Sequence, residues 1–111
     1  YIWSKYKIYN SYKSTKDLID KYDLDAFIGL TRGPAWKINY DGGDYIAMYN
    51  SLEFSSGGYA AHNGMPHITI PYFEINKFPV GISIIGDRWT DKAIIGYASA
   101  IEKSRYNLDT Q

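Results

Sequence analysis

The stretch HITIPYFEINKFPVGISIIG, residues 67–86, decides the fold that the sequence predicts. Its first half alternates in the manner of a half-buried strand, because successive side chains of a strand point to opposite faces. The residues that share one face are Ile68, Ile70 and Tyr72. The turn-like pair Asn76-Lys77 then leads into a second apolar run. We therefore predict an antiparallel hairpin over 67–86, in which Gly81 marks the close approach of a neighbouring segment.

Upstream of the hairpin, the run LDAFIGL at 24–30 predicts a strand buried on both faces, because it is short, apolar and without clean alternation. The residues before it, 1–22, contain no Gly or Pro and carry apolar side chains at three- and four-residue spacing, which predicts a helix. A motif at Ser14 that resembles a capping box leaves two shorter helices as the alternative, but one helix is favoured. A helix that leads into a buried strand predicts the α/β class.

The remaining segments predict loops and two further helices. Residues 31–58 contain a Gly-Pro pair and two Gly-Gly pairs, and so predict a long irregular segment of the kind that is usually functional or held by a partner. A short helix is expected over 58–63, ending at Gly64. After the hairpin, Thr90 is the expected N-cap of a last helix that frays near Tyr106. The expected apolar stripe of that helix comprises Ile94, Ile95, Ala98 and Ile101.

The composition limits the classes of function. The chain has 111 residues, which suit one domain, and 45% of them are hydrophobic, as in a globular protein. Its 12 basic and 12 acidic side chains balance, which argues against nucleic acid or an anionic membrane surface as a partner. Neither a membrane span nor a signal peptide is visible, so a cytoplasmic location is favoured without a compartment being assigned. The start at Tyr1 predicts a piece of something longer.

Several motifs in a fixed order resemble the amidase-signature family. The segment LDAFIGLTRGPAW, residues 24–36, is similar to that family's LDALIAPTxGPAW segment. Residues 60–104 resemble the family's closing segment, with TIP at 69–71 and PVGIS at 79–83. The resemblance covers nearly the whole chain. It implies a fragment of an α/β/α sandwich with a mixed sheet, in which residues 1–111 form a single domain that is the C-terminal part of the family's domain.

The resemblance also implies a function. Enzymes of this family hydrolyse amides, and some relatives act on esters, with a Ser nucleophile, a second Ser in a cis peptide and a Lys. These groups lie in the earlier part of the family's chain. The present chain is therefore expected to have no catalytic residue, to complete the sheet, to shape the entrance for a small-molecule amide substrate, and to be inactive alone. The alternatives are a non-enzymatic binding or assembly module and an α/β domain of unknown role.

The tetrapeptide SSGG at 55–58 is the one candidate for the catalytic signature itself, because that signature contains a similar motif around its cis-Ser. No D-x-G-G-S-x-R stretch follows it, and no Lys precedes it in a Val-Lys-Asp setting, since Lys37 lies in a predicted loop. An activated hydroxyl needs a base within hydrogen-bond reach, and the sequence points to none. The favoured interpretation is a glycine-rich loop that leads into a helix.

The substrate-binding candidates are Thr31, Arg32 and Trp36, because they follow the carboxyl end of the strand at 24–30, where ligands gather in α/β sheets. The resemblance points to the same loop. Other candidates have favoured structural roles: His62 and His67 as polar surface residues, Asp23 and Asp25 at the helix-to-strand junction, and Trp89 packing the last helix on the sheet. No metal site or cofactor is predicted, since the histidine spacing matches no zinc pattern.

The expected protein partner is the missing N-terminal part of the fold. Without it, an unpaired strand edge and apolar faces predict self-association, so a homo-oligomer is expected. The first helix, rich in Tyr and Lys, is expected to pack on the missing part. A nucleic-acid surface at that helix is the weaker interpretation, because the chain as a whole carries no net charge.

Overall fold

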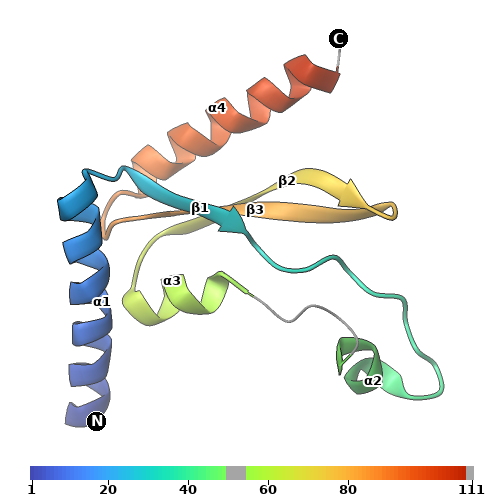
Figure 1. Cartoon of the computed structure of the whole chain (residues 1–111), viewed down its shortest axis with the longest axis horizontal. Helices are drawn as coiled ribbons and strands as arrows, with labels where there is room; N and C mark the ends of the chain where they lie inside the picture. The colour runs from blue at the N-terminus through green and yellow to red at the C-terminus, as the bar shows by residue number, and fades with distance from the viewer. Residues whose placement is uncertain (50–54, 110–111) are drawn as a thin grey trace.

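The computed structural model describes residues 1–49 and 55–109. Its elements in chain order are α1 (Ile2–Tyr22), β1 (Ala26–Leu30), α2 (Gly43–Tyr49), α3 (Gly57–Asn63), β2 (His67–Ile75), β3 (Phe78–Gly86) and α4 (Asp91–Asp109). The strands form one sheet in the order β1-β3-β2, and both neighbouring pairs are antiparallel. Figure 1 shows α4 on one side of this sheet and α3 on the other, with α1 standing where β1 begins. The α/β class is confirmed.

The predicted hairpin is confirmed with its turn. Strands β2 and β3 pair so that Ile75 faces Phe78, which leaves Asn76 and Lys77 as the two loop residues. Their φ angles are 52° and 68°. A two-residue turn with positive φ at both positions has the twist that antiparallel strands need. The register shifts between Pro71 and Phe73, where proline has no N–H to donate to the ladder.

Strand β1 pairs with β3, but the prediction that it is buried on both faces is wrong. Phe27 is half-buried opposite Ile85, whereas the side chain of Ile28 is 63% exposed. Helix α4 packs on β2 and β3 instead, and β1 forms the outer edge of the three described strands. The first two residues of β1 are therefore half-buried, and residues 28–30 are exposed in this chain.

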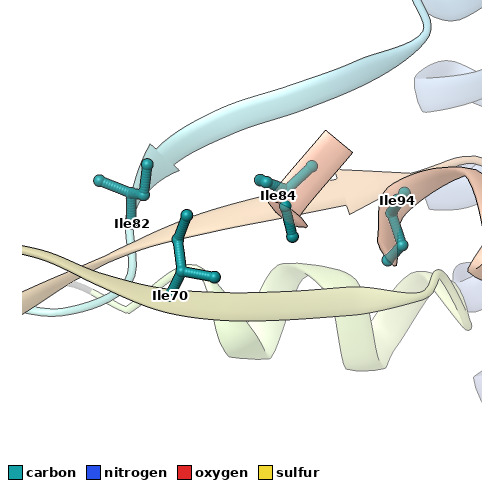
Figure 2. Close-up of a cluster of buried hydrophobic side chains, with 5 residues drawn as sticks. Ile70, Ile82, Ile84 and Ile94 are labelled. Atoms are coloured by element: carbon teal, nitrogen blue, oxygen red, sulfur yellow. The ribbon is translucent and has the colours of Figure 1, made fainter. Parts of the chain in front are cut away.

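Two apolar clusters lie on opposite faces of the sheet, because the side chains of β3 alternate. On one face, helix α4 covers the cluster of Ile70, Ile82, Ile84, Ile94 and Ala98. Figure 2 shows the four isoleucines of this cluster, three on strands β2 and β3 and the fourth, Ile94, on α4. On the other face, helices α1 and α3 cover the cluster of Ile19, Ala60, Met65 and Ile85. The local architecture is thus helix, sheet, helix, as the resemblance implied.

The helix predictions have mixed outcomes. Helix α1 is continuous, as favoured, and the hydroxyl of Ser14 bonds to the carbonyl of Asn10 inside it, so no cap forms there. Gly64 ends α3 in the left-handed conformation, which confirms its prediction. The prediction of an irregular segment over 31–58 missed α2. Its start follows a turn that the side chain of Asn39 holds by accepting two backbone N–H groups.

Around helix α4, the stripe prediction is wrong at Ile95, which is 59% exposed, and right at Ile94 and Ala98, which are buried. The packing role given to Trp89 is also wrong, because its side chain is 93% exposed. Trp89 lies in the tight turn before α4 with a φ of 68°, and its ring is exposed to solvent. Thr90 accepts the N–H of Ile94 with its carbonyl. The helix continues past the predicted fraying point to Asp109.

A polar hub fixes α1 against the turn between β3 and α4. The carboxylate of Asp87 accepts two hydrogen bonds, one from the Tyr12 hydroxyl and one from the backbone N–H of Arg88, each at 2.7 Å. Lys16 lies 2.9 Å from the other carboxylate oxygen. The guanidinium of Arg88 stacks 3.6 Å from the centroid of the Tyr12 ring, and its Nε donates to the carbonyl of Asn63. The hub therefore joins α1, the end of α3 and the start of α4.

Candidate functional site

A cavity of about 350 Å³ opens beside the carboxyl end of β1. The segment 31–36 forms one wall, and the opposite wall comes from Thr69 on β2 and from 79–81 on β3. All three predicted substrate-binding residues, Thr31, Arg32 and Trp36, line this one cavity. The structure therefore brings them together, while their contact with a substrate stays a prediction.

The wall formed by 31–36 has a local cause in the sequence. Pro34 disfavours the helical conformation at the preceding residue, so the chain leaves β1 in an extended path. The guanidinium of Arg32 lies 5.0 Å from the centroid of the Trp36 ring, a distance at which a cation and an aromatic face attract. Arg32 also forms an isolated antiparallel bridge with Ser55. These contacts hold the wall in place.

The wall opposite depends on Gly81. The N–H of Thr31 donates to the carbonyl of Gly81 at 2.9 Å, which continues the β1–β3 ladder. A Cβ at Gly81 would lie 2.7 Å from Cγ2 of Thr69 and 3.1 Å from Oγ1 of Thr31. The close approach predicted for this glycine is confirmed, and the segments that approach it are the two that bear the cavity's hydroxyl groups.

A cluster of hydroxyl groups lies behind the cavity on the α3 side of the sheet. Its centre is Ser83, which is 1% exposed. Oγ of Ser83 lies 2.8 Å from Ser56 Oγ, 2.8 Å from Thr31 Oγ1 and 2.6 Å from His67 Nε2. Thr31 Oγ1 in turn lies 3.3 Å from Thr69 Oγ1. Each of the four hydroxyl groups thus has a partner among the described residues, as a buried polar cluster requires.

Sequence reasoning missed this cluster and placed His67 on the surface. His67 is half-buried instead, because its imidazole bonds to a serine at the centre of the sheet. A signal was present in the alternation: Ser83 lies between isoleucines on β3, and His67 and Thr69 share one face of β2. Since paired strands bring residues on the same face together, these polar residues could have been recognised as one cluster once the hairpin register was known.

The glycine-serine segment has a structural role in the described residues. The N–H of Ser56 donates to the carbonyl of Thr31 at 3.1 Å, and its hydroxyl donates to Oγ of Ser83 at 2.8 Å. Helix α3 begins at the next residue, Gly57. This is the loop leading into a helix that the favoured interpretation describes. The absence of a nucleophile from this chain stays a prediction.

The other candidates remain outside the cavity. His62 is exposed and bonds through Nδ1 to the carbonyl of Gly58 at 3.0 Å. Asp23 ends α1 in the left-handed conformation, at the helix-to-strand junction as predicted, and Asp25 is exposed beside it. In the described part of the chain, no three His, Cys, Asp or Glu side chains are grouped to hold a metal ion. Among the same residues, no helix is both long and apolar enough to cross a bilayer.

No family model matches the chain, but comparisons with known proteins find relatives whose names indicate amide chemistry. The chain is 34% identical, over 89 residues, to a subunit of the glutamyl-tRNA(Gln) amidotransferase of Pseudothermotoga lettingae; the match covers 78% of this chain and 18% of the relative. It is 44% identical over 45 residues to the protein of the same name from Thermotoga maritima, covering 40% of this chain and 10% of the relative. The chain thus spans less than a fifth of the curated relatives it matches.

Comparison with solved structures also finds relatives, and one of them is a peptide amidase. The crystal structure of PAM12A superimposes with a TM-score of 0.67 at 31% identity, covering 79% of this chain and 16% of that one. Native peptide amidase from Stenotrophomonas maltophilia superimposes with a TM-score of 0.63 at 27% identity, with the same coverage. Sequence and structure therefore point to one group of enzymes. As the motifs predicted, the chain resembles the C-terminal portion of an amidase-signature enzyme.

Proposed function

We propose that residues 1–111 act as one unit, the C-terminal part of an amide hydrolase of the amidase-signature type. In this role the chain completes the sheet and shapes the entrance for a small-molecule amide substrate. The observation that carries the proposal is the cavity at the end of β1, which gathers Thr31, Arg32 and Trp36 within the segment that resembles amidases. The names of the relatives, which include a peptide amidase and a glutamyl-tRNA(Gln) amidotransferase, support amide chemistry.

The division of labour follows from the chemistry of acyl transfer. Such a reaction requires an activated hydroxyl, a base that takes its proton, and donors for the developing oxyanion. We place these groups in the part of the fold that lies outside this chain. The chain contributes a wall that is mostly apolar, with Arg32 and two threonine hydroxyls at its polar positions. It can therefore select and orient a substrate without carrying the reacting atoms.

The exposed apolar surface supports a role within a larger assembly. Ile28 on β1 and Ile95 on α4 are more than half exposed. A second shallow cavity, between β1 and α4, is lined by Ile28, Tyr97 and Ile101. In the complete enzyme this surface would be covered by the rest of the fold. In its absence, we expect two copies of the chain to associate through it, and sedimentation at high protein concentration should give dimers or larger species.

A chimera tests the proposal. The matching segment of the Stenotrophomonas maltophilia peptide amidase is replaced with this chain, and hydrolysis of a C-terminal peptide amide is measured. We expect turnover by the chimera and none by the isolated chain. Trp36→Ala should raise KM by about tenfold, which corresponds to about 1.4 kcal/mol of lost binding energy, with little change in kcat.

The matched control is Lys92→Ala, an exposed position on α4 away from the cavity, which should leave KM unchanged. Serine-dependent turnover by the isolated chain would refute the division of labour. An active chimera in which Trp36→Ala and Lys92→Ala have the same KM would refute the assignment of the cavity.

A further inference from the structure

The cavity has a polar position beyond those that the sequence singled out. Thr69 projects from β2 into the wall opposite Trp36 and is exposed. It is also the end of the hydroxyl cluster, since Thr31 Oγ1 lies within 3.3 Å of its Oγ1. The direction of each hydrogen bond in the cluster decides whether Thr69 presents a proton or a lone pair to the cavity, because a hydroxyl donates one proton only.

The donors can be assigned in order. Ser56 donates to Ser83 Oγ and Ser83 donates to Thr31 Oγ1, each at 2.8 Å, and Thr31 donates to Thr69 Oγ1 at 3.3 Å. Since the one proton of the Ser83 hydroxyl is donated to Thr31, the 2.6 Å contact between Ser83 Oγ and His67 Nε2 requires the imidazole to be the donor. With the hydroxyl groups in this direction, His67 donates from Nε2, and this atom does not accept the proton of Thr69, 3.4 Å away.

From this arrangement we propose that Thr69 is a ligand-binding residue, whose hydroxyl donates a hydrogen bond to an oxygen acceptor of the ligand in the cavity. The chain from His67 through Ser83 and Thr31 fixes the direction of that donor. The inference rests on the proposed function, because it takes the cavity to be the place where the amide substrate enters.

The second polar group of the cavity selects the same kind of ligand. Arg32 has donors only, and its guanidinium is held over the Trp36 ring. A cavity with a hydroxyl donor, a guanidinium and apolar walls favours an apolar group joined to a carbonyl or carboxylate oxygen. It disfavours an amine, which would bring further donors and a positive charge toward Arg32. The carbonyl of an amide substrate satisfies this requirement.

Titration of the full 111-residue chain by ¹⁵N NMR tests the inference, with benzamide as the probe and benzylamine as its matched control. We expect benzamide to shift the amide signals of Thr31 and Gly81, and benzylamine to leave them in place. A single hydrogen bond is worth about 0.5–1.5 kcal/mol, so Thr69→Val should weaken benzamide binding by about 2- to 12-fold. Thr69→Ser keeps the hydroxyl and should restore most of the affinity.

The outcomes separate the two proposals. If benzamide does not bind the unaltered chain at this cavity, the proposed entrance is refuted and the inference with it. If benzamide binds Thr69→Val as tightly as the unaltered chain, the cavity stands and the inference is overturned. The ¹⁵N shifts of the His67 ring give a readout that needs no ligand: neutral His67 should carry its proton on Nε2, and a proton on Nδ1 would overturn the assigned direction.

Discussion

Removal of the Asp87 carboxylate is expected to loosen α1 from the rest of the molecule. The side chain is 20% exposed and accepts the Tyr12 hydroxyl and the Arg88 N–H, each at 2.7 Å. Hydrogen bonds to a charged group are worth about 1.5–3 kcal/mol each, and an exposed ion pair such as that with Lys16 adds at most about 1 kcal/mol. Because neighbouring interactions are not additive, we expect Asp87→Ala to lower the free energy of unfolding by about 2–4 kcal/mol.

The same hub predicts a pH dependence. Burial alone would raise the pKa of Asp87, but the hydrogen bonds from Lys16 and Tyr12 outweigh it, and the pKa lies below its usual value. A carboxyl group whose pKa is lowered by folding stabilises the protein above its unfolded pKa, about 3.9, and loses this contribution as the pH falls through the folded pKa. The stability difference between the unaltered chain and Asp87→Asn should therefore shrink as the pH falls below about 4.

Urea unfolding, followed by far-UV circular dichroism at several pH values, measures both effects. The matched control is Asp20→Asn, because Asp20 contacts the same Lys16, at 2.8 Å, but is 62% exposed and lies on the same helix. Such a pair is worth about 0.3–0.5 kcal/mol, so the control should change little. If Asp87→Ala is as stable as Asp20→Asn at neutral pH, the hub does not hold α1 and the reasoning fails.

Two further substitutions probe the hairpin. Gly81→Ala brings a methyl group within 2.7 Å of Thr69 Cγ2 and should cost about 1–3 kcal/mol in the same urea assay; an unchanged midpoint would show that the close approach is absent. Lys77→Gly should stabilise the chain by about 0.5–1 kcal/mol, because Lys77 has a φ of 68° that glycine adopts at less cost, and a lower midpoint would contradict the assigned turn.

The hairpin and the strand beside it were predictable because their signals are local. Alternation over 67–75, the turn pair and the apolar run after it are each read within a few residues, and the structure has all of them. The burial of β1 was not predictable, since an apolar run such as 26–30 is typical of a buried strand and says nothing of whether the covering elements belong to this chain. The exposure of Ile28 depends on which elements cover β1, and the local sequence does not specify those elements.

The candidate site, like the fold, was predictable only where its signal lies within a few residues of the sequence. The position after a strand's carboxyl end indicated Thr31, Arg32 and Trp36, and these do share a cavity. The residues behind them were not found, because Ser83 and His67 are 16 positions apart and meet only through the register of the hairpin. Trp89 was misplaced because a large aromatic residue favours burial on average, whereas this one lies in a tight turn with a positive φ and is exposed.

The turn at Asn76-Lys77 connects the fold to the cavity through strand β3. Because side chains alternate along a strand, Ile82 and Ile84 face α4, while Gly81 and Ser83 face the opposite side with Thr31 and Thr69. A slip of one residue in the hairpin would exchange these faces, placing a serine in the apolar cluster and an isoleucine against Thr31. The two-residue turn fixes the register and so excludes that slip. The hydroxyl groups at the cavity therefore depend for their position on a turn at the far end of the hairpin.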